Sequence, residues 1–158
     1  MIENYSFVQV VAHVSRCLQT AFDAELKGLG LTAARGKVLF KLALAQTEVS
    51  QTEMTDFLRV ENPTAVRILD GLESLGYIKR VPADHDRRVK MIALTDAGRP
   101  LADRVVLVAR KLSSAVVEGL TPEDIAAAGK VLNKITANVA AAGVGRGTAS
   151  EGDDEASA

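Results

Sequence analysis

The segment KRVPADHDRRVKMIALTDAG, from Lys79 to Gly98, contains two short apolar-rich runs separated by a loop crowded with charges of both signs. The runs at 77–81 and 89–94 have the composition of strands, and the PADHDRR loop between them is long and hydrophilic for a simple hairpin turn. Hairpin loops are usually polar because they face water. The rest of the chain therefore decides whether the cationic tip of this hairpin has a function.

The composition restricts the classes of protein to which the chain can belong. Its 158 residues suit one domain, or one domain with an extended tail. The net charge of −1 provides no global basic field, so an anionic partner must be met by a local patch. The single cysteine excludes an internal disulfide framework. No run approaches the roughly 20 apolar residues that span a bilayer, and the N-terminus lacks the features of a signal peptide, so a cytoplasmic location is expected.

Apolar residues recur at steps of three and four in six segments, which is the spacing of one stripe along a helix. Hydroxyl residues suited to cap a helix start precede several of these segments, including Thr32, Ser50 and Thr121. Ser50 and Glu53 have the spacing of a capping box, in which each side chain bonds the other residue's backbone N–H. The predicted helices span about 3–26, 33–44, 51–58, 63–75, 97–115 and 122–139.

The fourth predicted helix has one apolar and one polar face. Asn62 is expected to be its N-cap and Pro63 its first residue, where the missing N–H of proline costs nothing. At 100° per residue, Arg67, Asp70 and Ser74 cluster on the outer face. The opposite face comprises Ala65, Ile68, Leu69, Leu72 and Leu75.

The elements follow one another as a short helix, a brief turn, a helix with an outward arginine, and a hairpin with a cationic tip. This order predicts a winged helix-turn-helix, because a helix fits the major groove of DNA and the hairpin reaches the neighbouring minor groove. Arg87 and Arg88 would then lie where the narrow minor groove concentrates negative potential. Asp84 or Asp86 would hold an arginine extended through a charge-assisted hydrogen bond.

Two segments carry a resemblance to a known family. DRRVKMIALT (86–95) has the D-x-R-x5-L-T wing pattern of the MarR family, and VENPTAVRILDGLESLGYIKR (60–80) closely resembles the recognition helix and first wing strand of its SlyA-like branch. The resemblance covers about residues 5–140. It implies a mainly α fold with a small β-hairpin wing, in a winged helix-turn-helix dimer. It also implies a transcriptional repressor that leaves a pseudo-palindromic operator when a small phenolic or other aromatic anion binds.

The resemblance also implies roles for residues of the two central helices. Arg67 matches the arginine that reads bases from the recognition helix, and Pro63 and Thr64 would lie beside it near the phosphates. Ser50 and Gln51, at the start of the preceding helix, are expected to contact the DNA backbone.

Four residues of the hairpin receive roles in the same way. Arg88 matches the arginine of the wing motif and is expected to enter the minor groove, with Asp86 as its orienting carboxylate. Asp86 itself is expected to be structural, because phosphates repel a carboxylate. Arg87 and Lys90 would contact phosphates or the flank of the wing.

The effector and its site are less constrained than the DNA interface. A ligand pocket is expected where the dimer helices meet the DNA-binding lobe, with His13 or Arg16 facing an anionic group. His13 and Cys17 share one helix face, but two ligands do not make a zinc site, so no metal is expected. Some MarR relatives sense peroxides through a helix-one cysteine supported by tyrosines. The only tyrosines here are Tyr5 and Tyr77, which departs from that pattern. A redox sensor is therefore the alternative and not the first prediction.

Two other classes of protein explain less of the sequence. An enzyme would have to use 84–86 (Asp-His-Asp) on a wet loop, and the chain has no Gly-rich phosphate cradle, nucleophile elbow or H-E-x-x-H helix, so no catalytic residue and no cofactor are expected. A helical protein–protein module would explain the apolar stripes but not the hairpin. The expected organisation is a dimerisation helix (1–31), a DNA-binding lobe (32–95), further dimerisation helices (96–142) and a disordered acidic tail (143–158).

Overall fold

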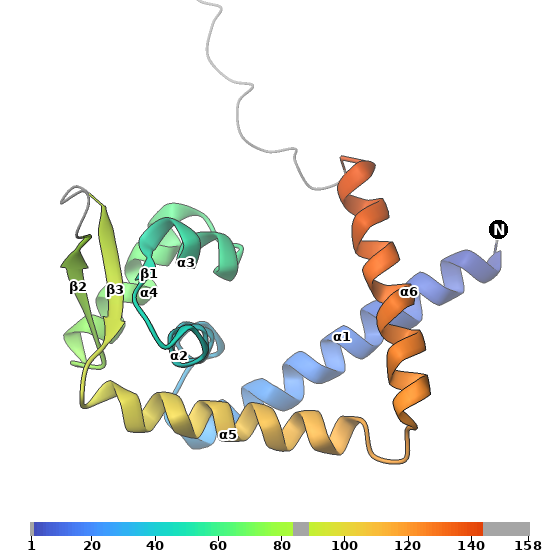
Figure 1. Cartoon of the computed structure of the whole chain (residues 1–158), viewed down its shortest axis with the longest axis horizontal. Helices are drawn as coiled ribbons and strands as arrows, with labels where there is room; N and C mark the ends of the chain where they lie inside the picture. The colour runs from blue at the N-terminus through green and yellow to red at the C-terminus, as the bar shows by residue number, and fades with distance from the viewer. Residues whose placement is uncertain (1, 84–88, 144–158) are drawn as a thin grey trace, which may run out of the picture. The chain divides into compact units, whose positions relative to one another are not determined.

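The computed structural model describes residues 2–83 and 89–143, which are mainly helical with one small sheet (Figure 1). The residues up to Val116 form one compact unit, and the helix that follows belongs to a second unit. In chain order the elements are α1 (Ile2–Gly28), α2 (Ala33–Ala45), β1 (Val49–Ser50), α3 (Gln51–Leu58), α4 (Asn62–Ser74), β2 (Ile78–Pro82), β3 (Lys90–Leu94), α5 (Gly98–Val116) and α6 (Pro122–Ala141).

The sheet has three antiparallel strands in the order β1-β3-β2. The predicted hairpin is confirmed, with Ile78 opposite Leu94 at its base and Pro82 opposite Lys90 toward its tip. The sequence pattern did not predict β1, because a strand of two residues is too short to show alternation. Val49 of this strand is buried and pairs with Ile92, so the segment before α3 is attached to the wing.

The helix starts confirm most of the predicted caps. The Thr32 hydroxyl accepts from the Arg35 N–H, and Thr121 and Asp124 form a complete capping box at the start of α6. Of the two hydrogen bonds of the capping box predicted at Ser50, only one forms. The Ser50 hydroxyl accepts from the Glu53 N–H at 3.1 Å. The Glu53 carboxylate instead pairs with Nζ of Lys41 in α2 at 2.8 Å.

The start of α4 differs from the prediction by one residue. Glu61, and not Asn62, is the N-cap, and no side-chain hydrogen bond caps this helix. The Glu61 carbonyl accepts from the N–H groups of Thr64 and Ala65, both at 3.0 Å, so helical bonding already begins there. The predicted apolar face is correct for Ala65, Leu69 and Leu72, which are buried. Leu75 is 52% exposed because α4 ends at Ser74 and Leu75 lies in the C-cap.

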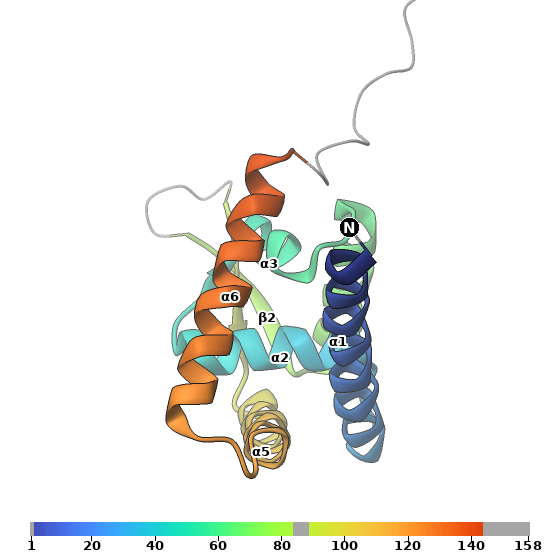
Figure 2. The same ribbon diagram turned by 90° about the vertical axis from the view of Figure 1, so that its right-hand side faces the viewer.

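The core of the first unit lies between α2, α4, α5 and the sheet. Figure 1 views α2 nearly end-on and α5 from the side, and Figure 2 reverses this, so the two helices cross steeply where they pack. The largest fully buried side chains are Leu26, Val38, Leu39, Val49, Met54, Leu69, Leu72, Ile78, Ile92 and Val105. This packing determines how α3, α4 and the hairpin present their outer faces.

Apolar side chains at both ends of the chain are left uncovered. On α1, Phe7 and Val14 are each 47% exposed. On α6, Leu132 is 46% and Val139 is 49% exposed, and no residue of this helix is buried. Over the described part of the chain, no helix is long and apolar enough to cross a membrane.

Candidate nucleic-acid interface

The helices α3 and α4 form a helix-turn-helix in which buried side chains set the outward direction of α4. Three residues connect them, beginning with Arg59, whose φ of 53° reverses the chain at the end of α3. Met54 of α3 and Leu69 of α4 are fully buried. Arg67 is exposed, as expected for the face opposite Leu69. Arg67 therefore has the exposure that a base-reading side chain requires.

The helix N-termini hold the other predicted contacts. Pro63 and Thr64 are exposed in the first turn of α4. Ser50 and Gln51 are partly buried at the start of α3, and the Ser50 hydroxyl is already used in capping. The positive end of a helix dipole suits a phosphate. At α4, Pro63 has no N–H and the Thr64 N–H already bonds the Glu61 carbonyl, so the Thr64 side chain and not the backbone is the candidate donor there.

The wing is described only in part. Lys90 is exposed at the start of β3 and lies opposite Pro82. Asp86, Arg87 and Arg88 lie outside the described residues, so their predicted roles stay predictions. The last paired residues before this gap are joined by a bond from the Ala83 N–H to the Val89 carbonyl at 3.0 Å.

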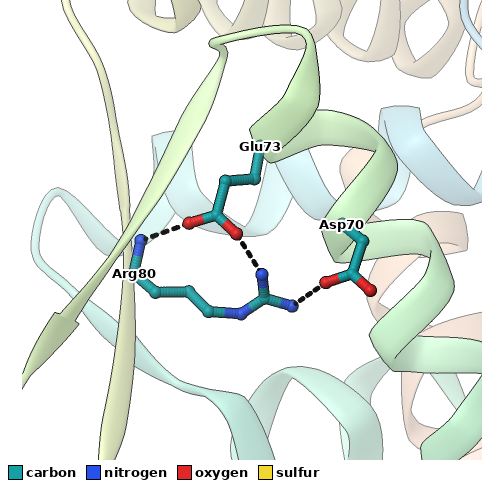
Figure 3. Close-up of polar contacts among 3 residues, drawn as sticks. All are labelled: Asp70, Glu73 and Arg80. Carbon is teal, nitrogen blue, oxygen red and sulfur yellow. Dashed lines mark hydrogen bonds and ion pairs between the residues drawn. The ribbon is translucent and has the colours of Figure 1, made fainter.

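The recognition helix and the wing are joined by an ionic cluster that sequence reasoning missed (Figure 3). Arg80 of β2 has a side chain only 15% exposed, and its Nη2 lies 2.7 Å from Asp70 Oδ1 of α4. Glu73 accepts from the Arg80 backbone N–H at 3.1 Å and also pairs with Nη1 of the guanidinium. Two carboxylates three residues apart on a helix, followed by an arginine in the next strand, could have indicated this cluster.

A second junction ties the base of the wing to α5. The Thr95 hydroxyl donates to the Gly76 carbonyl at 2.6 Å and accepts from the Gly98 N–H at 3.0 Å. Gly98 lies so close to the sheet that an added Cβ would come within 1.9 Å of the Tyr77 carbonyl oxygen. The Thr95 hydroxyl thus links the turn after α4 to the start of α5.

The predicted effector residues lie on the exposed surface of α1. His13, Arg16 and Cys17 are all exposed, and Cys17 Sγ is 3.5 Å from His13 Nε2. They do not line the cavity of about 280 Å³ found between α1 and α5. That cavity is lined by Glu25, Leu29, Arg104, Leu107, Val108 and Lys111. Among the described residues, no group of three or more His, Cys, Asp or Glu side chains could hold a metal ion.

Known proteins share both the sequence and the fold. Residues 29–89 match the model of the MarR family. The chain is 35% identical to the transcriptional regulator PA3341 over 84% of this chain and 97% of that one, and the two structures have a TM-score of 0.78. This chain belongs to the MarR family. It is thus a DNA-binding transcriptional regulator and not an enzyme.

Two further MarR-family structures are similar over most of the chain. A MarR-family regulator from Silicibacter pomeroyi is 28% identical, with a TM-score of 0.72, over 88% of this chain and 92% of that one. A mutant MarR from E. coli, solved in complex with operator DNA, is 25% identical, with a TM-score of 0.70, over 84% of this chain and 95% of that one. The predicted winged helix-turn-helix with a small antiparallel wing is therefore confirmed.

Proposed function

We propose that this MarR-family protein binds a pseudo-palindromic operator as a homodimer and represses transcription from it. In this proposal α4 enters the major groove and the β2–β3 wing reaches the adjacent minor groove. The observation that carries it is the division of α4 into a face buried by Ala65, Leu69 and Leu72 and an outer face that exposes Arg67. The E. coli relative solved in complex with operator DNA supports operator binding by this chain. The resemblance of residues 60–80 to the SlyA-like branch leads us to place the protein there.

The proposed DNA contacts fall into two groups. Arg67 reads base edges, because a guanidinium can donate two hydrogen bonds to guanine in the major groove. The other helix residues meet the backbone. Of the wing residues, Arg87, Arg88 and Lys90 meet the minor groove and its phosphates, and Asp86 orients Arg88. The first group comprises Ser50, Gln51, Pro63, Thr64 and Arg67, and the second comprises Asp86, Arg87, Arg88 and Lys90.

The homodimer is supported by the apolar side chains that the single chain leaves uncovered. Leu132 and Val139 of α6 and Phe7 and Val14 of α1 are each nearly half exposed. A row of exposed apolar side chains along each helix is typical of an interaction site, and a two-fold dimer is the most common assembly that would cover such faces. Two-fold symmetry would then require an inverted repeat with half-sites about one helical turn apart.

The DNA-binding proposal is tested by in vitro selection with the full-length protein. The parent should enrich an inverted repeat, and Arg67→Ala should lose about 1–3 kcal/mol on it and relax preference at particular bases. Arg110→Ala removes an exposed arginine of α5 and serves as the matched control. Failure to enrich any sequence would contradict operator binding, and equal base preference in Arg67→Ala would contradict the role of Arg67.

We also propose that a small aromatic anion releases the operator. The α1–α5 cavity supports this, because it combines apolar walls from Leu29 and Leu107 with the cations Arg104 and Lys111. A hundredfold loss of operator affinity requires about 2.7 kcal/mol of coupling, and DNA must then weaken ligand binding by the same factor. Salicylate titration of Arg104→Ala, Lys111→Ala and Arg16→Ala would separate this cavity from the site first predicted at His13 and Arg16.

A redox-sensing regulator of the same fold is the second candidate. The observation that favours it is the exposed Cys17 thiol, 3.5 Å from the His13 ring. Under this alternative, operator release should need an oxidant and should disappear in Cys17→Ser. Release by salicylate in Cys17→Ser as well as in the parent would support the small-ligand proposal instead.

A further inference from the structure

The outer face of α4 carries an acidic side chain beside its exposed arginine. Asp70 follows Arg67 by three residues, so the two side chains are neighbours on the helix surface. An ion pair between them would occupy the guanidinium to which the proposed function gives the reading of bases. Instead, the Asp70 carboxylate bonds Arg80 of β2, with 2.7 Å between Oδ1 and Nη2 (Figure 3).

Arg80 is held in place from two sides. Its strand pairs with β3, where Arg80 lies opposite Ile92. The Glu73 carboxylate accepts a hydrogen bond from the backbone N–H of Arg80 and pairs with its guanidinium. Glu73 and the sheet therefore hold the Arg80 guanidinium in place independently of Asp70. Because the Arg80 side chain is only 15% exposed, solvent and salt screen its bond to Asp70 less than they would screen an exposed pair on the helix surface. Asp70 thus has a better partner in Arg80 than in Arg67.

We propose that Arg80 is a positioning residue that holds Asp70 away from Arg67 and so leaves Arg67 available to the bases. This inference rests on the proposed function, because it requires Arg67 to read the operator. Glu73 plays a different part: it fixes Arg80, and at six residues from Arg67 it lies on another side of the helix. Asp70 and Glu73 therefore carry the same charge near the DNA, but only Asp70 can capture Arg67.

This difference provides a charge-matched test. Base discrimination is measured as the affinity for the selected operator relative to one with the Arg67-dependent bases replaced in both half-sites. Arg80→Gln should lower this ratio about two- to fivefold, because an exposed i, i+3 pair is weak but competes at both half-sites. Adding Asp70→Asn should restore the ratio, whereas adding Glu73→Gln should not, although each removes one negative charge.

The outcomes separate this inference from the proposed function. Equal restoration by the two second-site changes, or an unchanged ratio in Arg80→Gln, would overturn the positioning role. Base discrimination that survives Arg67→Ala in the parent would instead overturn the proposed reading by Arg67. Thermal melts check that each variant folds. If Arg80→Gln does not fold, Arg80→Lys carries the same second-site changes, because one ammonium cannot bond both carboxylates with the fork geometry of arginine.

Discussion

The winged helix-turn-helix and α6 differ in where their apolar side chains find contacts. In the first region α4 buries Ala65, Leu69 and Leu72 within its own chain. In α6 no residue is buried, although its apolar residues follow an equally regular stripe. Regular spacing therefore predicts a helix with an apolar face, but it does not say whether the same chain or a second copy covers that face. The proposed dimer makes this difference testable.

The largest effect is expected for a charge introduced on α6. Leu132→Asp would place two carboxylates in a two-fold interface, one from each copy, and burying them without partners costs roughly 4 kcal/mol or more, about a thousandfold in dimer affinity. Sedimentation of the variant should show monomer where the parent is a dimer. Lys130→Asp, on the same helix, provides a charged control away from the stripe. A dimeric Leu132→Asp would contradict the role of α6 in assembly.

A smaller loss is expected in the core of the helix-turn-helix. Leu69→Ala removes a fully buried side chain and should lower the free energy of unfolding by about 3 kcal/mol, because it leaves a cavity among close-packed neighbours. Chemical denaturation measures the loss. Ile125→Ala, at an α6 position that is 43% exposed in the single chain, is the comparison. Because Ile125 is packed less completely within its own chain than Leu69, Ile125→Ala should lower the free energy of unfolding by much less, and equal losses would contradict the difference between the two regions.

Two glycines of the first unit sharpen the comparison further. A Cβ at Gly98 would meet the Tyr77 carbonyl oxygen at 1.9 Å, so the backbone must shift and Gly98→Ala should cost about 2 kcal/mol. The atoms nearest to a Cβ at Gly71 of α4 would all belong to the Arg35 side chain, with Nη2 closest at 2.7 Å. That side chain can move, and alanine favours the helix, so Gly71→Ala should stay within about 0.5 kcal/mol of the parent. Thermal unfolding of both variants tests the order, which equal effects would refute.

The sequence predicted what local patterns control. Six helices, the hairpin and the winged order followed from apolar spacing, caps and turn residues, and the caps at Thr32 and Thr121 were correct. Contacts between elements were beyond this kind of reasoning. The local pattern does not show that Glu53 pairs with Lys41. The spacing of Asp70 and Glu73 indicates a basic partner, but it does not identify that partner as Arg80 of the wing. The candidate DNA contacts came mainly from family resemblance, because exposure alone does not distinguish Arg67 from any solvated arginine.

The smallest effect is expected at the start of α6, where the test concerns the helix cap of Thr121 and Asp124 and not the packing of side chains. The pKa of Asp124 is lowered below its ordinary value of 3.8, first by the hydrogen bond from the Thr121 backbone N–H and second by that from the Thr121 hydroxyl. The pKa of Asp124 is lower in the folded than in the unfolded chain. The cap therefore stabilises the helix fully at pH values above 3.8, and this contribution is lost as the pH falls through the lowered pKa. NMR titration should place the Asp124 pKa below 3.8, and Thr121→Ala should move it part of the way back, because the backbone donor remains. A pKa that does not move in Thr121→Ala would show that the hydroxyl contributes nothing to this cap.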